Sequence, residues 1–113
     1  MTSHAELSKQ LALALGYCPE SVRVKPNYGG GEHVLVYSKR GTHRKFPKWR
    51  VFDYRSPDVA MPLLVWLLDK HDMECYCELG LFVVRTSDVH HYVTADTLEE
   101  AIARAVIAVK GGK

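Results

Sequence analysis

The stretch of sequence that decides the fold class is MECYCELGLFVVRT, residues 73–86. Apolar or thiol side chains occupy every second position of its first half, and these are Met73, Cys75, Cys77 and Leu79. Because alternate residues of a strand share one face, this half predicts an amphipathic strand. Gly80 interrupts the alternation, and a second apolar run, 81–86, follows directly. The pattern predicts an antiparallel hairpin, to which residues 89–93 add a possible third strand.

Helix signals flank this hairpin on both sides. Upstream, Ser56-Pro57-Asp58 is a typical helix start, and the helix is expected to end near His71. Pro62 lies inside it, where the missing N–H predicts a bend or an early 3₁₀ turn. Downstream, Asp96 is the expected cap of a last helix, with Glu99 completing a capping box. The expected inner stripe of that helix is Leu98, Ile102, Val106 and Val109.

The first half of the chain contains one helix and two strands by the same criteria. The spacing of its leucines predicts a helix over 3–15, which starts at a serine cap and is ended by Gly16. A loop rich in proline and glycine follows. Alternating side chains then predict strands at 33–38 and 49–54. We expect these strands to form a hairpin across the basic segment 39–50.

These elements give the order α-β-β-α-β-β(-β)-α. Because the connections between strands are short, we expect a mostly antiparallel sheet packed by helices, an α+β layered domain. The chain has 113 residues, of which 47% are hydrophobic and 25% charged. This size suits a single domain over residues 1–113, with a frayed tail at 110–113. The composition excludes a disordered, collagen-like or disulfide-rich protein.

The location of the protein is predicted from its apolar runs and its cysteines. The start of the chain is polar and does not resemble a secretory signal. The longest apolar run, residues 59–68, is far shorter than the ~20 residues of a membrane span. Three cysteines, an odd number, predict reduced thiols. We therefore expect a cytoplasmic protein.

A metal site is the first chemistry that the histidines and cysteines suggest. The candidate ligands are His71, Cys75, Cys77, His90 and His91. Structural zinc sites favour pairs of cysteines with at least two residues between them on a tight turn, whereas one residue separates Cys75 and Cys77 on a regular strand. Buried thiols pack as small hydrophobic groups. We therefore expect no metal and no cofactor. The rival hypothesis is a metal-dependent enzyme built on His71, Cys75, Cys77 and His90.

Motifs of the common hydrolases and nucleotide-binding enzymes are absent from the sequence. Gly29-Gly30-Gly31 does not open a helix, as a phosphate-binding loop requires. None of the three cysteines has a sequence neighbour that would lower the pKa of its thiol. The sequence therefore predicts a protein that is not an enzyme.

The strongest functional signal is the basic segment KRGTHRKFPKWR, residues 39–50, which has six lysines and arginines and no acid. The expected binding residues are Lys39, Arg40, Arg44, Lys45 and Lys48, with Trp49 and Arg50 as second choices. Cations with interleaved rings are typical of proteins that bind single-stranded nucleic acid, and they serve an acidic protein partner equally well. The structural alternative is that the lysines protect an edge hairpin from aggregation and that Trp49 belongs to the core.

Two further motifs carry a resemblance to a known family. Residues 52–60, FDYRSPDVA, open the middle helix, and Ala95-Asp96-Thr97 opens an alanine-rich last helix. The first helix ends in the run LALALG, residues 11–16. With these motifs, residues 49–109 resemble the phage ABA (α/β/α) sandwich domain of small tailed-phage proteins. The resemblance implies a phage or prophage origin and a layered α/β fold, and it supplies no catalytic residues.

Together these expectations describe a small non-enzymatic phage or prophage accessory protein that binds a host or phage macromolecule in the host cytoplasm. A protein partner is favoured, and inhibition of a host defence or regulatory complex is the expected role. The alternative function is a nucleic-acid-binding module that uses the hairpin 39–50. No membrane partner is expected. The oligomeric state is left open, with a homodimer as one option.

Overall fold

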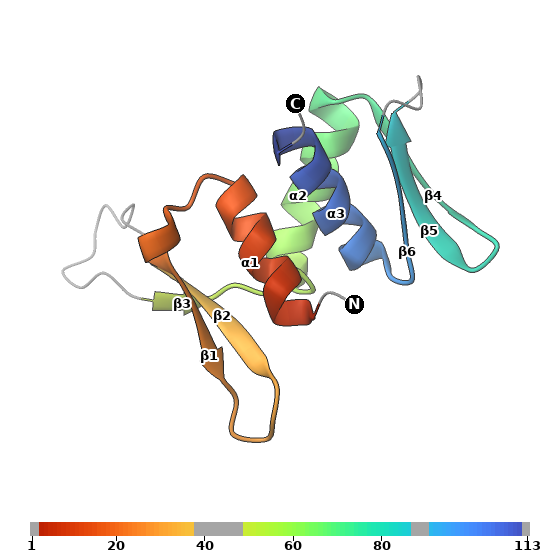
Figure 1. Ribbon diagram of the computed structural model, residues 1–113. Coiled ribbons are helices and arrows are strands. Elements are labelled where there is room, and N and C mark those ends of the chain that lie inside the picture. The colour runs from red at the N-terminus through yellow and green to blue at the C-terminus, as the bar shows by residue number, and fades with distance from the viewer. Residues whose placement is uncertain (1–2, 38–48, 87–90, 112–113) are drawn as a thin grey trace. The chain divides into compact units, whose positions relative to one another are not determined.

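A computed structural model describes residues 3–37, 49–86 and 91–111 of the chain (Figure 1). Its elements, in chain order, are helix α1 (His4–Ala14), the 3₁₀ turn η1 (Pro19–Ser21), strands β1 (Val22–Pro26), β2 (Glu32–Tyr37) and β3 (Trp49–Val51), helix α2 (Pro57–Lys70), strands β4 (Met73–Glu78), β5 (Leu81–Thr86) and β6 (Tyr92–Ala95), and helix α3 (Leu98–Gly111). The expected α+β class, with helices packed on antiparallel strands, is confirmed.

The described strands form two antiparallel sheets with the orders β1-β2-β3 and β4-β5-β6. The chain divides into two compact units, Met1–Asp53 and Tyr54–Lys113, each of which contains one of these sheets. The first unit holds α1, and the second holds α2 and α3. The prediction of a single domain over residues 1–113 stays a prediction.

Helix α1 of the first unit begins and ends where its capping residues predict. The hydroxyl of Ser3 accepts a hydrogen bond from the backbone N–H of Glu6 at 3.1 Å. At the other end, Gly16 has a φ of +102°, a conformation that residues with a Cβ rarely adopt. The N–H of Tyr17 then bonds back to the carbonyl of Ala12 at 3.2 Å, which completes a Schellman motif. Helix α1 lies against β1 and β2.

The sheet of the first unit has one strand more than the sequence predicted. In β1, Val22 and Val24 alternate with two cations, and they pair with Val36 and Val34 of β2. These valines face the same side of the sheet, and those of β2 are buried. The predicted hairpin partners β2 and β3 do pair, although β3 ends at Val51, before the predicted end at residue 54.

Helix α2 of the second unit follows the predicted bounds and runs unbroken through Pro62. The expected 3₁₀ turn at Pro62 is wrong, since residues 57–70 are α-helical throughout, and the expected bend stays a prediction. Pro62 is exposed, so water can solvate the carbonyl that its missing N–H leaves without a partner. Among the described helices, none combines the length and the apolar character needed to cross a membrane.

The predicted hairpin 73–86 is confirmed as β4 and β5, and the possible third strand is present as β6, shifted to residues 92–95. The predicted faces are also correct, because Met73, Cys75 and Cys77 lie on one side of β4. Leu79 is the exception. It lies in the turn with a φ of 54°, and its side chain is 96% exposed.

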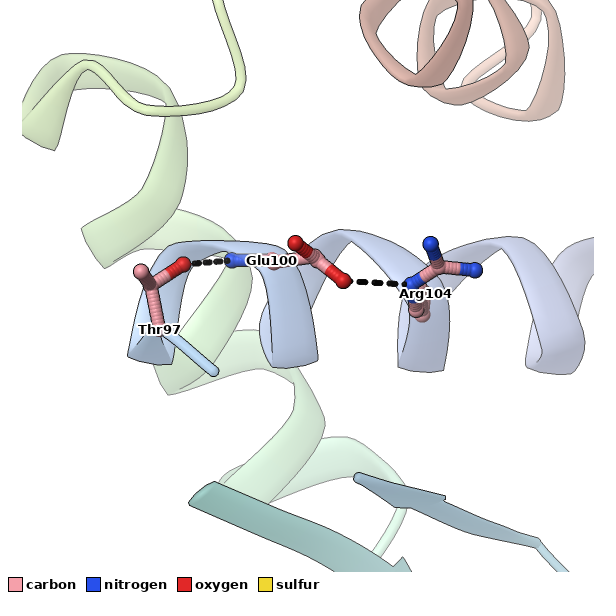
Figure 2. A network of polar contacts seen from close by, with 3 residues as sticks. All are labelled: Thr97, Glu100 and Arg104. Atoms are coloured by element: carbon pink, nitrogen blue, oxygen red, sulfur yellow. Dashed lines mark hydrogen bonds and ion pairs between the residues drawn. The ribbon is translucent and has the colours of Figure 1, made fainter. Parts of the chain in front are cut away.

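Helix α3 is capped one residue later than predicted. The hydroxyl of Thr97, and not the side chain of Asp96, accepts the backbone N–H of Glu100 at 3.2 Å (Figure 2). The reciprocal bond of a capping box is not seen here, because the carboxylate of Glu100 turns forward to Arg104 at 3.0 Å. The reason for the later cap is geometric. Thr97 directly precedes the first helical residue, and a side chain at that position reaches the free N–H groups of the first turn.

Helix α3 packs on β5 and β6 and also on α2. Its buried residues are Ala101, Ile102, Ala103, Ala105 and Val106. Ile102 and Val106 of the predicted stripe are thus confirmed, whereas Leu98 and Val109 are half-buried. Small alanines share the buried surface because neighbours cover the helix from two directions. Lys110 belongs to this helix and not to a frayed tail, and its ammonium lies 5.0 Å from the ring centre of Trp66.

Candidate binding face

Five of the predicted binding residues, Lys39, Arg40, Arg44, Lys45 and Lys48, lie outside the described residues. The second choices, Trp49 and Arg50, are part of β3. The two side chains point to opposite sides of the sheet, because Trp49 pairs with Tyr37 and Arg50 pairs with buried Val36. The structure therefore assigns these two residues to different surfaces.

Trp49 lies on the side of the sheet that faces away from the buried valines. The residues that share this side are Arg23 and Lys25 from β1, His33, Leu35 and Tyr37 from β2, and Trp49 and Val51 from β3. We call this surface the basic-aromatic face. Arg23 and Lys25 are exposed, and 66% of the Val51 side chain is exposed, although it is apolar. The alternative prediction that Trp49 is a core residue is wrong, since Trp49 is half-buried on this outer side.

Three side chains from three strands stack at one end of the basic-aromatic face. The guanidinium carbon of Arg23 lies 4.5 Å from the ring centre of Trp49, which is a cation–π distance. The ring of Tyr37 meets Trp49 edge to face, with centroids 5.3 Å apart and an angle of 64°. Arg23 and Tyr37 thereby hold the indole in one orientation on the sheet.

The electrostatic character of the basic-aromatic face follows from the residues that the register places there. None of its seven residues is acidic. Within the described ranges, no carboxylate is paired with Arg23, Lys25 or Arg50. Two permanent cations therefore remain available to a negatively charged partner. His33 carries a third basic group, and its Nδ1 is hydrogen-bonded to the side-chain oxygen of Asn27.

The second sheet has a similar outer side with the opposite charge. Glu74, Tyr76 and Glu78 of β4 share this side with Arg85 of β5 and Tyr92 of β6. The one cation is already neutralised, because a guanidinium nitrogen of Arg85 lies 3.1 Å from a carboxylate oxygen of Glu74. Each sheet thus has two aromatic rings on its outer side, but only the first combines them with available cations. This contrast supplies a matched control for experiments on the basic-aromatic face.

The predicted metal and nucleophile candidates do not form a site within the described part of the chain. There, groups of three or more His, Cys, Asp or Glu side chains placed to hold a metal ion are absent. His90 lies outside the described residues. Burial raises the pKa of the Cys75 thiol above its ordinary value, which lowers the fraction of reactive thiolate at neutral pH. The half-buried Cys75 on the helix-covered side of β4 agrees with its expected role in packing.

Sequence reasoning missed Arg23, Lys25 and Tyr37. A signal for the first two was present, since Val22 to Lys25 alternate between apolar and basic residues with the period of a strand. The run is only four residues long and lies between two prolines, so it is a weak indication of a strand. No local signal could have linked Arg23 to Trp49, because 25 positions separate them and only the strand register brings them together.

Comparison with models of known protein families, with curated proteins and with solved structures finds no match for this chain. The resemblance to the phage ABA sandwich domain is therefore carried by the quoted motifs alone and stays a prediction. The function has to be inferred from the residues of the basic-aromatic face and from the distribution of charge.

Proposed function

We propose that this chain is a small non-enzymatic binding protein, of the phage or prophage accessory type, that attaches its first unit to a negatively charged region of a host or phage macromolecule. The observation that carries the proposal is the separation of charge between the units. Residues 1–53 contain nine Lys and Arg and four Asp and Glu, whereas residues 54–113 contain six and nine. Such a separation steers the basic unit toward an anionic surface.

The basic segment and the basic-aromatic face support this proposal together. Tyr37 and Trp49 are cross-strand partners at the stacked end of the face, and in the sequence the basic segment begins two residues after Tyr37 and includes Trp49. Cations in this segment add to Arg23 and Lys25 in attracting the same partner. The combined charge supports a salt-sensitive contact that is broader than the segment alone.

An accessory role would follow from binding alone. A protein that covers a functional surface of a larger complex inhibits that complex without any chemistry of its own. The resemblance to small phage proteins makes a host defence or regulatory complex in the cytoplasm the proposed target. The absence of a recognised catalytic motif in the sequence is compatible with this role.

The proposal is tested by affinity capture from a bacterial lysate with two variants that each remove three positive charges. The test variant carries Lys39→Ser, Arg44→Ser and Lys48→Ser, and the matched control carries Lys9→Ser, Lys70→Ser and Lys113→Ser. We expect the test variant to lose most of the captured material and to release the rest at lower salt. The control should behave like the native chain, since its two described lysines, on α1 and α2, are exposed helix residues that do not belong to the basic-aromatic face.

Equal capture of the same partners by both variants would show that the basic segment is not a contact surface. Capture that does not weaken with salt would also contradict the proposal, because an interaction between opposite charges is screened.

A further inference from the structure

We infer that the basic-aromatic face binds single-stranded nucleic acid, with bases stacked beside Trp49 and Tyr37 and with phosphates held by Arg23 and Lys25. This inference rests on the proposed function and names the chemical class of its partner.

The stacked end of the face has the chemistry that unpaired bases require. Bases in a single strand expose flat π-faces, and proteins bind them on aromatic rings or on the planes of arginine side chains. Here Trp49 and Tyr37 offer two rings with centroids 5.3 Å apart, and Arg23, 4.5 Å from the indole centre, places a cation beside them. Because these neighbours already hold the indole, little side-chain freedom is lost when a base stacks, which favours binding.

The cations are spaced for a backbone that follows the strands. Arg23 and Lys25 are two residues apart on β1, so their side chains leave the same side of the sheet about 7 Å apart. From Tyr37 to His33 along β2 the face extends about 13 Å, which accommodates more than one nucleotide of an extended strand. Edge strand β1 thus supplies the charge, and β2 and β3 supply the rings.

The apolar centre of the face favours an unpaired strand over the other anionic partners. Leu35 and Val51 form a cross-strand pair between the rings and Lys25, and most of Val51 is exposed. A duplex would bring only hydrated phosphates to this surface, because its bases are stacked on each other. An acidic peptide would pair with the cations and leave the rings without a role. An unpaired base covers the apolar pair and the rings together.

The chain contains two tryptophans, one in each unit, and this provides a direct test. In a Trp66→Phe variant, Trp49 is the only tryptophan, and in a Trp49→Phe variant, Trp66 is the only one. Each variant is titrated at low salt with mixed-sequence DNA and RNA oligonucleotides of about 12 nucleotides, a length within the range of known single-strand sites. We expect single strands to quench the fluorescence of Trp49 and to leave that of Trp66 unchanged. The duplex of the same sequence should quench neither.

A second measurement compares affinities by fluorescence anisotropy of labelled oligonucleotides. Trp49→Leu and Tyr37→Leu should each weaken binding about tenfold, as expected for the loss of one stacked base. Lys25→Gln should reduce the slope of log affinity against log salt by about 0.7, as expected for one phosphate contact to a single strand. The matched controls Tyr76→Leu and Tyr92→Leu remove the rings on the outer side of the second sheet and should leave the affinity unchanged. If Trp49→Leu does not fold, the quenching experiment still decides.

The outcomes separate this inference from the proposed function. Binding of oligonucleotides without quenching of Trp49, or equal binding of duplex and single strand, would overturn the role of the basic-aromatic face. If the chain binds no oligonucleotide at low salt but still captures a partner from a nuclease-treated lysate, the partner is not a nucleic acid. The proposed function would then hold with a protein partner. If the native chain neither binds oligonucleotides at low salt nor captures a partner from the lysate, both proposals are wrong.

Discussion

Leu79 has a backbone conformation that leucine disfavours. It is the first residue of a two-residue turn between β4 and β5, and its φ is 54°, followed by Gly80 at 82°. A turn with two positive φ values matches the twist of the hairpin, and asparagine followed by glycine is its preferred sequence. Leucine is tolerated here at a cost of about 1 kcal/mol because its Cβ crowds the carbonyl group that follows. The 96% exposed side chain does not offset this cost by packing.

Leu79→Asn is therefore expected to stabilise the protein, by about 0.5–1 kcal/mol in the free energy of unfolding. Asparagine adopts positive φ more readily than leucine and loses no buried contact at this position. The measurement is urea unfolding followed by far-UV circular dichroism, with the native chain beside the variant.

The control for this prediction is Leu81→Asn, which places the same side chain two residues further on. Leu81 pairs with Glu78 in the regular part of the hairpin and is only 37% exposed. It should lower the free energy of unfolding, because asparagine disfavours strands and the leucine loses contacts. A destabilised Leu79→Asn variant would mean that the turn is not strained by leucine.

At the scale of elements, helix ends were predictable because their signals are local. Ser3 and Gly16 lie at the ends of α1, and both act through hydrogen bonds to groups no more than a few residues away. Asp96 was assigned as a cap because aspartate is among the best capping residues, but its neighbour Thr97 caps α3 instead. Sequence does not resolve two adjacent capping residues, since both satisfy the same local pattern.

The cap of α3 can be assigned by experiment with two single substitutions. Thr97→Ala removes the hydroxyl that accepts the N–H of Glu100 and should lower the free energy of unfolding by about 1 kcal/mol. Asp96→Ala should cost only a few tenths of a kcal/mol, because its exposed carboxylate retains no more than a weak interaction with the helix dipole. Chemical unfolding curves of both variants give the comparison. The reverse order of the two effects would restore Asp96 as the cap.

Strands were predicted less completely than helices because their stability depends on partners distant in the sequence. The alternation in residues 73–79 was long enough to identify β4 and its two faces. The shorter alternation of β1 has meaning only beside β2, which buries Val22 and supplies the partner of every β1 residue. The candidate site depended on this missed strand. The charge of residues 39–50 can be seen directly in the local sequence. The stack of Arg23, Trp49 and Tyr37, in contrast, forms only because the register of three strands brings these side chains together.

At the scale of the whole molecule, the two units differ in how much of their sheets is covered. Among its described residues, the first unit has one α-helix for three strands, and the outer side of its sheet exposes Val51. The second unit has two helices, one of which, α3, is packed by both a sheet and α2. Units of 50–60 residues bury only about 60% of the surface that the unfolded chain exposes, so each is marginally stable. The smaller unit with the single helix should be the less stable.

We therefore expect the two units to unfold at different denaturant concentrations, with the first unit unfolding earlier. Fluorescence of Trp49 in the Trp66→Phe variant reports the first unit, and fluorescence of Trp66 in the Trp49→Phe variant reports the second. Far-UV circular dichroism of each variant, which follows the whole chain, controls for the effect of the substitution itself. Because two-state unfolding requires all probes to change together, coincident curves would instead establish one cooperative domain over residues 1–113. If the curves are separate, we expect a partner bound to the basic-aromatic face to raise the free energy of unfolding of the first unit alone. The size of this increase is set by the concentration and affinity of the partner.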